Sequence, residues 1–224
     1  MIRRIARALK FRVLKQSIGS FDSLKKSLPT TLLEVEQLRS NESELKSYYQ
    51  YYVKEISRAD MAVSLQLATL LLTICKNVKP GKLLDLGSGF SSFVFRKYAK
   101  STTSVRVVSV DDDVQWLSRT HQYLDGLLSD QQDLLALPAF VESKEGDFDI
   151  VLLDLNFVEV RKDYIRLAVG RCKKGGIVIF DDTHKPDFLF DVLKQTRDLP
   201  ISLFDVAPVT RDQFGRYALL GVKK

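Results

Sequence analysis

The chain has 224 residues, the size of one large domain or two small ones. Hydrophobic residues make up 45% of it and charged residues 28%, a balance that excludes intrinsic disorder and fibrous arrays. Its two cysteines, Cys75 and Cys172, lie far apart in apolar stretches. We therefore expect free thiols and a cytoplasmic protein.

The net charge of +6 is concentrated at the N-terminus, and the rest of the chain is neutral. This distribution argues against a nucleic-acid partner, which needs clustered basic residues across the fold. Apolar residues within 1–16 recur at helical spacing. They predict an amphipathic helix, which either lies on an anionic membrane surface or packs on the protein. The basic residues of this segment are Arg3, Arg4, Arg7, Lys10, Arg12 and Lys15.

Residues 1–78 are predicted to form a helical segment that caps a second domain, residues 79–224. The most apolar run, 61–75, is too short and too polar to span a bilayer and is predicted to be a buried helix. Four tyrosines precede it, and they form either an aromatic wall over a substrate or part of the core. They are Tyr48, Tyr49, Tyr51 and Tyr52.

From residue 79 onward, short β-rich runs alternate with helical segments, as is typical of a mainly parallel α/β sheet. Strands are predicted at 82–86, 105–110, 149–154, 176–180, 201–206 and 217–222, with one more between 134 and 141. Helices are predicted at 91–99, 114–128, 160–172 and 187–196. Because residues 207–216 contain Pro208 and Gly215 and leave no room for a helix, the last two strands are expected to pair antiparallel.

A glycine turn joins the first of these strands to its helix. Gly87 and Gly89 lack the Cβ atom that would keep a ligand away from the backbone. The helix that follows offers unpaired N–H groups to an anionic ligand. Asp111 ends the next strand, where a carboxylate can accept both hydroxyls of a ribose.

Two ligand classes fit this arrangement, dinucleotides and S-adenosylmethionine (SAM). The dinucleotide pattern has a third Gly or Ala at position 92, where this chain has Ser92, so that pattern is incomplete here. Asp85, before the turn, favours SAM because a carboxylate attracts the ammonium of its methionine part and repels a pyrophosphate. An NAD-binding oxidoreductase stays as the alternative.

Residues 85–89, Asp111 and the run 175–184 together resemble class I SAM-dependent methyltransferases. The resemblance covers roughly 83–222 and implies a Rossmann-like, seven-stranded, mostly parallel sheet with a reversed last strand. It also implies the cofactor-binding residues, with Glu142 and Ser143 as loose candidates for the adenine. The implied cofactor-binding residues are Asp85, Gly87, Ser88, Gly89, Phe90, Ser91, Asp111 and Asp112.

Three carboxylates, Asp154, Asp181 and Asp182, follow two predicted strands and are expected at the edge that carries the glycine turn. Such a set either holds Mg²⁺, which would acidify a hydroxyl, or caps local loops. Catechol-type and sugar-modifying O-methyltransferases carry acids in a similar pattern, and this resemblance implies a Mg²⁺ site. The chain departs from the catechol enzymes at Phe157, where they have a basic residue.

His184 is the candidate base, with a loop histidine as the plainer interpretation, and Asp154 is the second candidate catalytic residue. The sequence thus favours a SAM-dependent, Mg²⁺-assisted O-methyltransferase for a small molecule or glycan. A metal-free methyltransferase that uses His184 stays open, as does a catalytically silent, membrane-associated binding protein. Peripheral membrane contact through residues 1–16 and a homo-oligomer are further expectations.

Overall fold

The computed structural model describes residues 11, 13–27, 34–102, 104–127 and 133–224. Within them, seven strands form one sheet in the order β3-β2-β1-β4-β5-β7-β6. Only the pairs that involve β7 are antiparallel. The predicted Rossmann-like sheet with a reversed last strand is therefore confirmed. The strands are β1 (Lys82–Leu86), β2 (Arg106–Asp111), β3 (Leu134–Ala136), β4 (Phe148–Leu153), β5 (Cys172–Phe180), β6 (Ile201–Asp205) and β7 (Leu219–Lys223).

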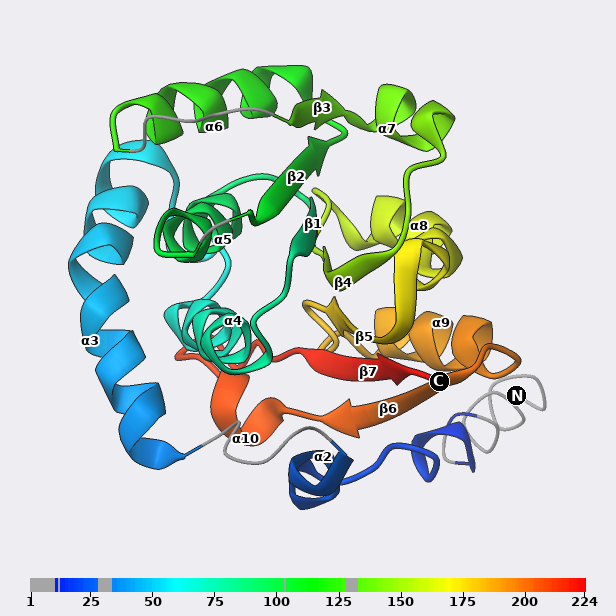
Figure 1. The fold of residues 1–224 in the computed structure, drawn as a ribbon. Helices are drawn as coiled ribbons and strands as arrows, with labels where there is room; N and C mark the ends of the chain where they lie inside the picture. The colour runs from blue at the N-terminus through cyan, green and yellow to red at the C-terminus, as the bar shows by residue number, and fades with distance from the viewer. Residues whose placement is uncertain (1–10, 12, 28–33, 103, 128–132) are drawn as a thin grey trace.

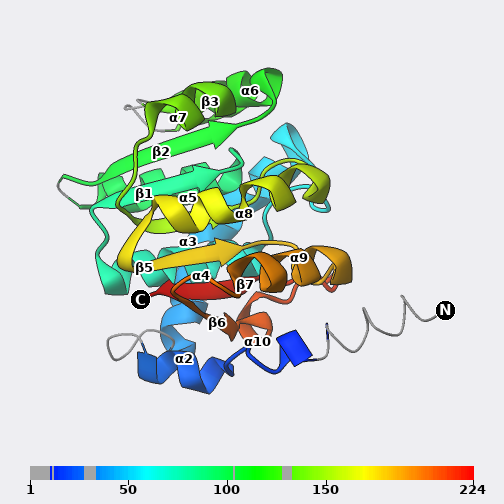
Figure 2. The same cartoon turned by 90° about the vertical axis from the view of Figure 1, so that its right-hand side faces the viewer.

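Both faces of the sheet are buried because successive side chains of each strand point to opposite sides. In β4, Ile150 and Leu152 belong to one core cluster, and Val151 and Leu153 belong to the other. Helices cover both faces (Figures 1 and 2). On the first face lie α3 (Val35–Tyr51), α4 (Leu65–Val78), α5 (Phe90–Lys100) and α6 (Val114–Asp125). On the second lie α7 (Leu137–Ser143), α8 (Val158–Arg171) and α9 (Pro186–Thr196).

Two predicted elements differ from the structure near prolines. The strand expected between 134 and 141 is short, because Pro138 lies in the first turn of α7, where its fixed φ angle favours a helix. A four-residue helix, α10 (Ala207–Thr210), fits between β6 and β7, so the expectation that no helix could lie there was wrong. A single turn needs only four residues, and Pro208 lies at its second position, where its fixed φ angle suits a helix. The antiparallel pairing of the last strands was correct.

The predicted buried helix 61–75 begins later, at Leu65. Ser64 caps it, since its side chain accepts a hydrogen bond from the Leu67 N–H at 3.1 Å. Met61 lies in the preceding loop and is 55% exposed. The middle of α4 is buried in the core cluster on the first face of the sheet. The division of the chain into two domains at residue 78 stays a prediction.

The N-terminal residues that the structure describes lie along the free edge of β6. Gly19 pairs with this strand, donating to Leu203 O and accepting from the Asp205 N–H, and α2 (Phe21–Ser27) follows it. This contact covers an edge that would otherwise expose unpaired backbone groups. Most of the predicted amphipathic helix 1–16 lies outside the described residues. In the part that is described, no helix is long and apolar enough to cross a membrane. Both cysteines are buried and free, as predicted.

Candidate functional site

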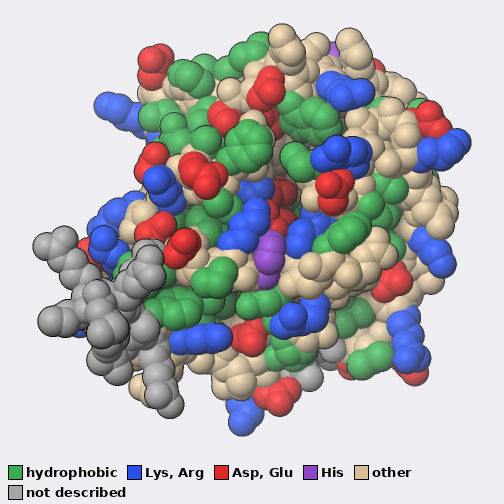
Figure 3. Space-filling model, turned by 180° about the vertical axis from the view of Figure 1, so that it is seen from behind, with side chains coloured by type: hydrophobic (Ala, Val, Ile, Leu, Met, Phe, Trp, Pro, Cys, Tyr) green, Lys and Arg blue, Asp and Glu red, His purple; other side chains and the backbone are tan. Residues whose placement is uncertain are grey.

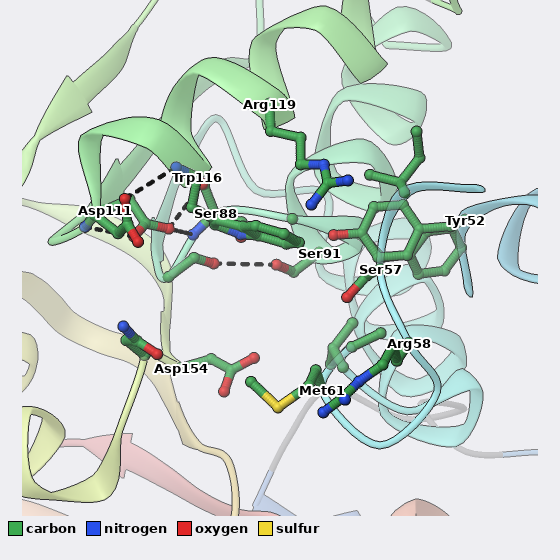
Figure 4. A pocket seen from close by; sticks show the side chains of 18 of the residues that line it. Tyr52, Ser57, Arg58, Met61, Ser88, Ser91, Asp111, Trp116, Arg119 and Asp154 are labelled. Carbon is green, nitrogen blue, oxygen red and sulfur yellow. Dashed lines mark hydrogen bonds between the residues drawn. The ribbon is translucent and has the colours of Figure 1, made fainter. Parts of the chain in front are cut away.

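A cavity of about 500 Å³ opens at the carboxyl ends of β1, β2 and β4, a size suited to a small-molecule ligand. Figure 3 shows a hollow in which acidic side chains are surrounded by Lys, Arg and one His, and Figure 4 shows the cavity from close by. Residues from the 52–63 segment form its opposite wall. The sequence-predicted site residues that line it are Gly87, Ser88, Gly89, Phe90, Ser91, Asp111 and Asp154. Those that do not are Asp85, Asp112, Asp181, Asp182 and His184.

Gly87 and Gly89 are required by neighbouring parts of the protein. Gly87 has a φ angle of 117°, and a Cβ atom there would lie 2.1 Å from the carbonyl oxygen of Asp154. A Cβ atom on Gly89 would lie 2.9 Å from the hydroxyl oxygen of Tyr52. The first glycine therefore allows the turn to pack against the end of β4, and the second leaves room for a tyrosine hydroxyl.

Asp85 lies fully buried behind the turn. Its Oδ2 atom accepts hydrogen bonds from Ser92 Oγ at 2.5 Å and Ser91 Oγ at 3.0 Å, whereas its buried Oδ1 atom has no partner in the described part of the chain. Burial raises the pKa of this carboxyl to about 7. Ser92, which breaks the dinucleotide pattern, also accepts from the Gly89 N–H. The turn therefore has an unpartnered acceptor, and an ammonium group is the kind of donor that would satisfy it.

Asp111 holds the turn from the end of β2. Its Oδ2 atom accepts from the Ser88 N–H at 2.7 Å and from Ser88 Oγ at 2.8 Å, and its Oδ1 atom accepts from the Asp113 N–H at 3.0 Å. Oδ1 keeps acceptor capacity for a ligand hydroxyl. Asp112 accepts from the Asn156 N–H at 3.4 Å and is not among the residues that line the cavity. The structure does not place Asp112 at the cavity.

Trp116 lies on α6 and contributes an aromatic ring to the cavity wall. Its Nε1 atom donates to Ser88 O at 2.7 Å, which fixes the ring beside the glycine turn. The Arg119 guanidinium lies 5.7 Å from the ring centre, and both side chains line the cavity (Figure 4). An indole face suits a purine ring. The loose adenine candidates, Glu142 and Ser143, lie at the end of α7 and do not line the cavity.

Tyr52 is the cavity-lining member of the tyrosine quartet. It begins a π-helical turn, η1 (Tyr52–Ile56), and its buried ring packs against Phe90 and Tyr123 at centroid distances of 5.4 and 4.9 Å. Its hydroxyl is directed toward the glycine turn (Figure 4). Tyr48 and Tyr49 pack on phenylalanine rings of α5. Three members of the quartet thus pack in or against the core, and the aromatic wall over a substrate stays a prediction for Tyr52.

Arg216 fastens the loop that roofs the cavity. Its guanidinium donates to the backbone carbonyls of Ala59 at 2.8 Å, Asp60 at 2.9 Å and Ala62 at 3.1 Å, and its Nε atom donates to Asp212 at 2.7 Å. These bonds join the 57–63 loop to the connection between β6 and β7. The sequence analysis missed this residue because the bonded groups are more than 150 positions apart.

The three predicted metal ligands do come together, but around an arginine. Arg161 of α8 forms ion pairs with Asp154 at 2.7 Å and Asp182 at 3.2 Å, and Lys185 forms a third with Asp182 at 2.9 Å. Among the described residues, no group of three His, Cys, Asp or Glu side chains is arranged to hold a metal ion. The carboxylates therefore do not fit the predicted Mg²⁺ site.

His184 lies beyond this cluster. Its Nδ1 atom is 3.5 Å from Asp182 Oδ1, and neither buried atom has a hydrogen-bond partner among the described residues. Burial lowers the pKa of His184, so the ring is neutral near pH 7. Because it does not line the cavity, the structure does not bring it together with the glycine turn. Asp154, the other candidate catalytic residue, does line the cavity, and burial raises its pKa well above the ordinary value.

Solved structures of methyltransferases are similar to this fold. The SAH-bound methyltransferase PaMTH1 of Podospora anserina matches with a TM-score of 0.61 and 14% identity, over 88% of this chain and 100% of that one. The O-methyltransferase from Bacillus cereus, in complex with SAH, gives 0.61 and 13%, over 91% and 96%. The SAM complex of the O-methyltransferase TomG from Streptomyces achromogenes gives 0.58 and 16%, over 86% and 91%.

No model of a protein family matches the sequence, and no curated protein matches it either. The structural likenesses therefore describe the fold, and they agree with the sheet order and reversed strand found here. The chain has the fold of the class I SAM-dependent methyltransferases.

Proposed function

We propose that the protein is a SAM-dependent methyltransferase. The observation that carries this proposal is the buried, unpartnered Oδ1 atom of Asp85 behind a glycine turn that borders the cavity. An ammonium group would satisfy that atom, and SAM carries one, whereas the pyrophosphate of NAD would be repelled. Bound SAM and SAH in structures of the same fold support the choice of ligand.

The glycine turn and the cavity residues divide between the parts of this ligand. Asp85, behind the turn, attracts the ammonium, and the N–H groups at the start of α5 receive the carboxylate. Asp111 accepts a ribose hydroxyl, and Trp116 stacks on the adenine. When bound, SAM supplies a methyl group that a sulfonium centre activates for transfer. Tyr52 and the loop that follows it shield that centre from water.

The acceptor is proposed to be a hydroxyl on a small molecule or glycan. The neighbours described as O-methyltransferases support oxygen as the nucleophile. We place Asp154 as the group that takes the acceptor proton, because it combines a position on the cavity wall with a raised pKa. His184 is less suited to this role because it does not line the cavity and its nearest charged partner is Asp182.

Calorimetry with SAH and with 5′-methylthioadenosine tests this proposal. The second compound keeps the adenosine and lacks the amino-acid part. The wild type should bind both, and Asp85→Asn should weaken SAH at least tenfold while changing methylthioadenosine less than threefold. Asp112→Asn is the matched control, since this carboxylate lies next to Asp111 but outside the cavity, and it should change neither affinity. A wild type that binds NADH but neither adenosine compound would contradict the proposal.

A further inference from the structure

The guanidinium of Arg161 is enclosed by acceptors on several sides. Besides Asp154 and Asp182, it donates to two backbone carbonyls, from Nε to Leu155 and from Nη2 to Asn156 at 3.2 Å. Its side chain is only 7% exposed. A buried guanidinium with this many partners has a fixed position, because moving it would take the ion-pair partner from Asp154 and leave Asp182 with Lys185 alone.

The cluster holds cations of its own, two beside three carboxylates. Three carboxylates, those of Asp154, Asp181 and Asp182, face the cations of Arg161 and Lys185. Asp181 lies close enough to Asp182 and Arg161 to interact with both electrostatically, and burial raises its pKa to about 6. A divalent cation in the same place would have to displace the Arg161 guanidinium from the carboxylates. It would then lie close to the positive charge of that buried guanidinium, which would repel it.

The backbone at Asp182 fits this arrangement. Its φ angle of 58° is left-handed, a conformation that aspartate adopts more readily than most residues. Its Oδ2 atom then receives both Arg161 and Lys185. The chain thus adopts an uncommon conformation at the residue on which both cations meet.

We infer that Arg161 is the resident cation of this acidic cluster and that it occupies the place a divalent metal ion would take. Its consequence for catalysis rests on the proposed function: Arg161 is a positioning residue that holds Asp154 at the cavity wall, and methyl transfer requires no divalent metal. The acids would then become a metal site only when the guanidinium is removed.

The test compares the wild type with Arg161→Met, with the double variant Asp154→Asn/Arg161→Met, and with Arg166→Met. Arg166 is the matched control, because it lies on the same helix and pairs with Asp198 at 2.9 Å at the surface. Each protein is assayed for Mn²⁺ binding by the loss of the free-ion EPR signal. Each is also melted in EDTA and in millimolar MgCl₂ or MnCl₂.

The wild type and Arg166→Met should bind no Mn²⁺ at the cluster and should melt at the same temperature with and without metal. Arg161→Met should melt on the order of 10 °C lower in EDTA, because it leaves buried carboxylates uncompensated. It should also bind one Mn²⁺ ion, and in MnCl₂ its melting temperature should rise part of the way back to the wild-type value. The melting temperature of the double variant should fall less than that of Arg161→Met, since the double variant removes a negative charge together with the positive one.

Mn²⁺ binding by the wild type that Asp154→Asn abolishes would overturn the inference. So would an Arg161→Met protein that melts like the wild type, or one that is destabilised but gains no Mn²⁺ binding. If Arg161→Met does not fold, the wild-type titration and the double variant decide the question. None of these readouts uses SAM, so a failure of SAH to bind would count against the proposed function and leave this result standing.

Discussion

Ser92 donates a 2.5 Å hydrogen bond to one carboxylate oxygen of Asp85 and leaves the other oxygen buried without a partner. The serine thereby fixes the position of the Asp85 carboxylate but leaves one of its two oxygens without a hydrogen bond. A third small residue at position 92, as in dinucleotide-binding turns, would remove this bond. The departure from the dinucleotide pattern is therefore part of how the turn presents Asp85.

SAH binding should depend on pH through Asp85. In the free protein this carboxyl keeps its proton below about pH 7, whereas an ammonium partner favours the ionised form. SAH affinity should therefore rise with pH, by up to about tenfold per unit between pH 5.5 and 7, and then level off. Calorimetry across this range should show a flat profile for methylthioadenosine. A steep profile in Asp85→Asn would assign the dependence to another group.

The same raised pKa has an opposite effect on the free protein. Between the ordinary aspartate pKa and about pH 7, the native state holds a proton that the unfolded chain has released. The free energy of unfolding should therefore fall as the pH rises through this range, and SAH should reduce that loss. Urea unfolding at pH 5, 6 and 7, with and without SAH, measures both effects.

The sheet could be predicted because its signals are local. A short apolar run and a glycine turn mark residues 82–91, and the reversed strand follows from a short connection that contains Pro208 and Gly215. The acids at strand ends were also placed at one edge correctly. The cation beside these acids was not predicted. Arg161 lies within a helix, and in the sequence it resembles a solvent-exposed charged residue. Likewise, nothing near Arg216 in the sequence indicates that it binds the 59–62 backbone, and a π-helical turn at Tyr52 has no sequence pattern.

Gly87→Ala should destabilise the protein by about 3 kcal/mol or more. Its Cβ would overlap the Asp154 carbonyl, and its φ angle of 117° is strained for any residue with a side chain. Gly170→Ala is the control, because no atom lies within 4 Å of its added Cβ and it sits in α8. That variant should gain up to about 1 kcal/mol from helix propensity. Equal stabilities for the two variants, measured by urea unfolding, would contradict this account of the turn.

Asp154→Asn should lower kcat by about 100-fold or more, since the amide keeps the shape of the side chain but does not accept a proton. His184→Ala should lower kcat less than about fivefold, because His184 is not among the residues that line the cavity. The measurement is SAH release from SAM with any hydroxyl acceptor that screening shows to turn over. Both variants should keep the wild-type affinity for SAH. The opposite order of effects would make His184 the base and remove Asp154 from that role.

Arg216→Ala should loosen the roof of the cavity without unfolding the sheet. The three carbonyls of the 59–62 segment would lose their common donor, so the loop should open more often. Trypsin should then cleave faster after Arg58, which is exposed in this loop. SAH should also bind about tenfold more weakly, because loop 57–63 lines the cavity. Arg211→Ala is the matched control, since its guanidinium stacks 4.6 Å from the Tyr217 ring, whereas the carbonyls of the 59–62 segment accept from Arg216. Arg216→Lys should recover only part of the protection, because one ammonium does not reproduce the planar fork that spans three carbonyls. Identical cleavage rates at Arg58 in Arg216→Ala and the wild type would show that the loop is held by its own packing.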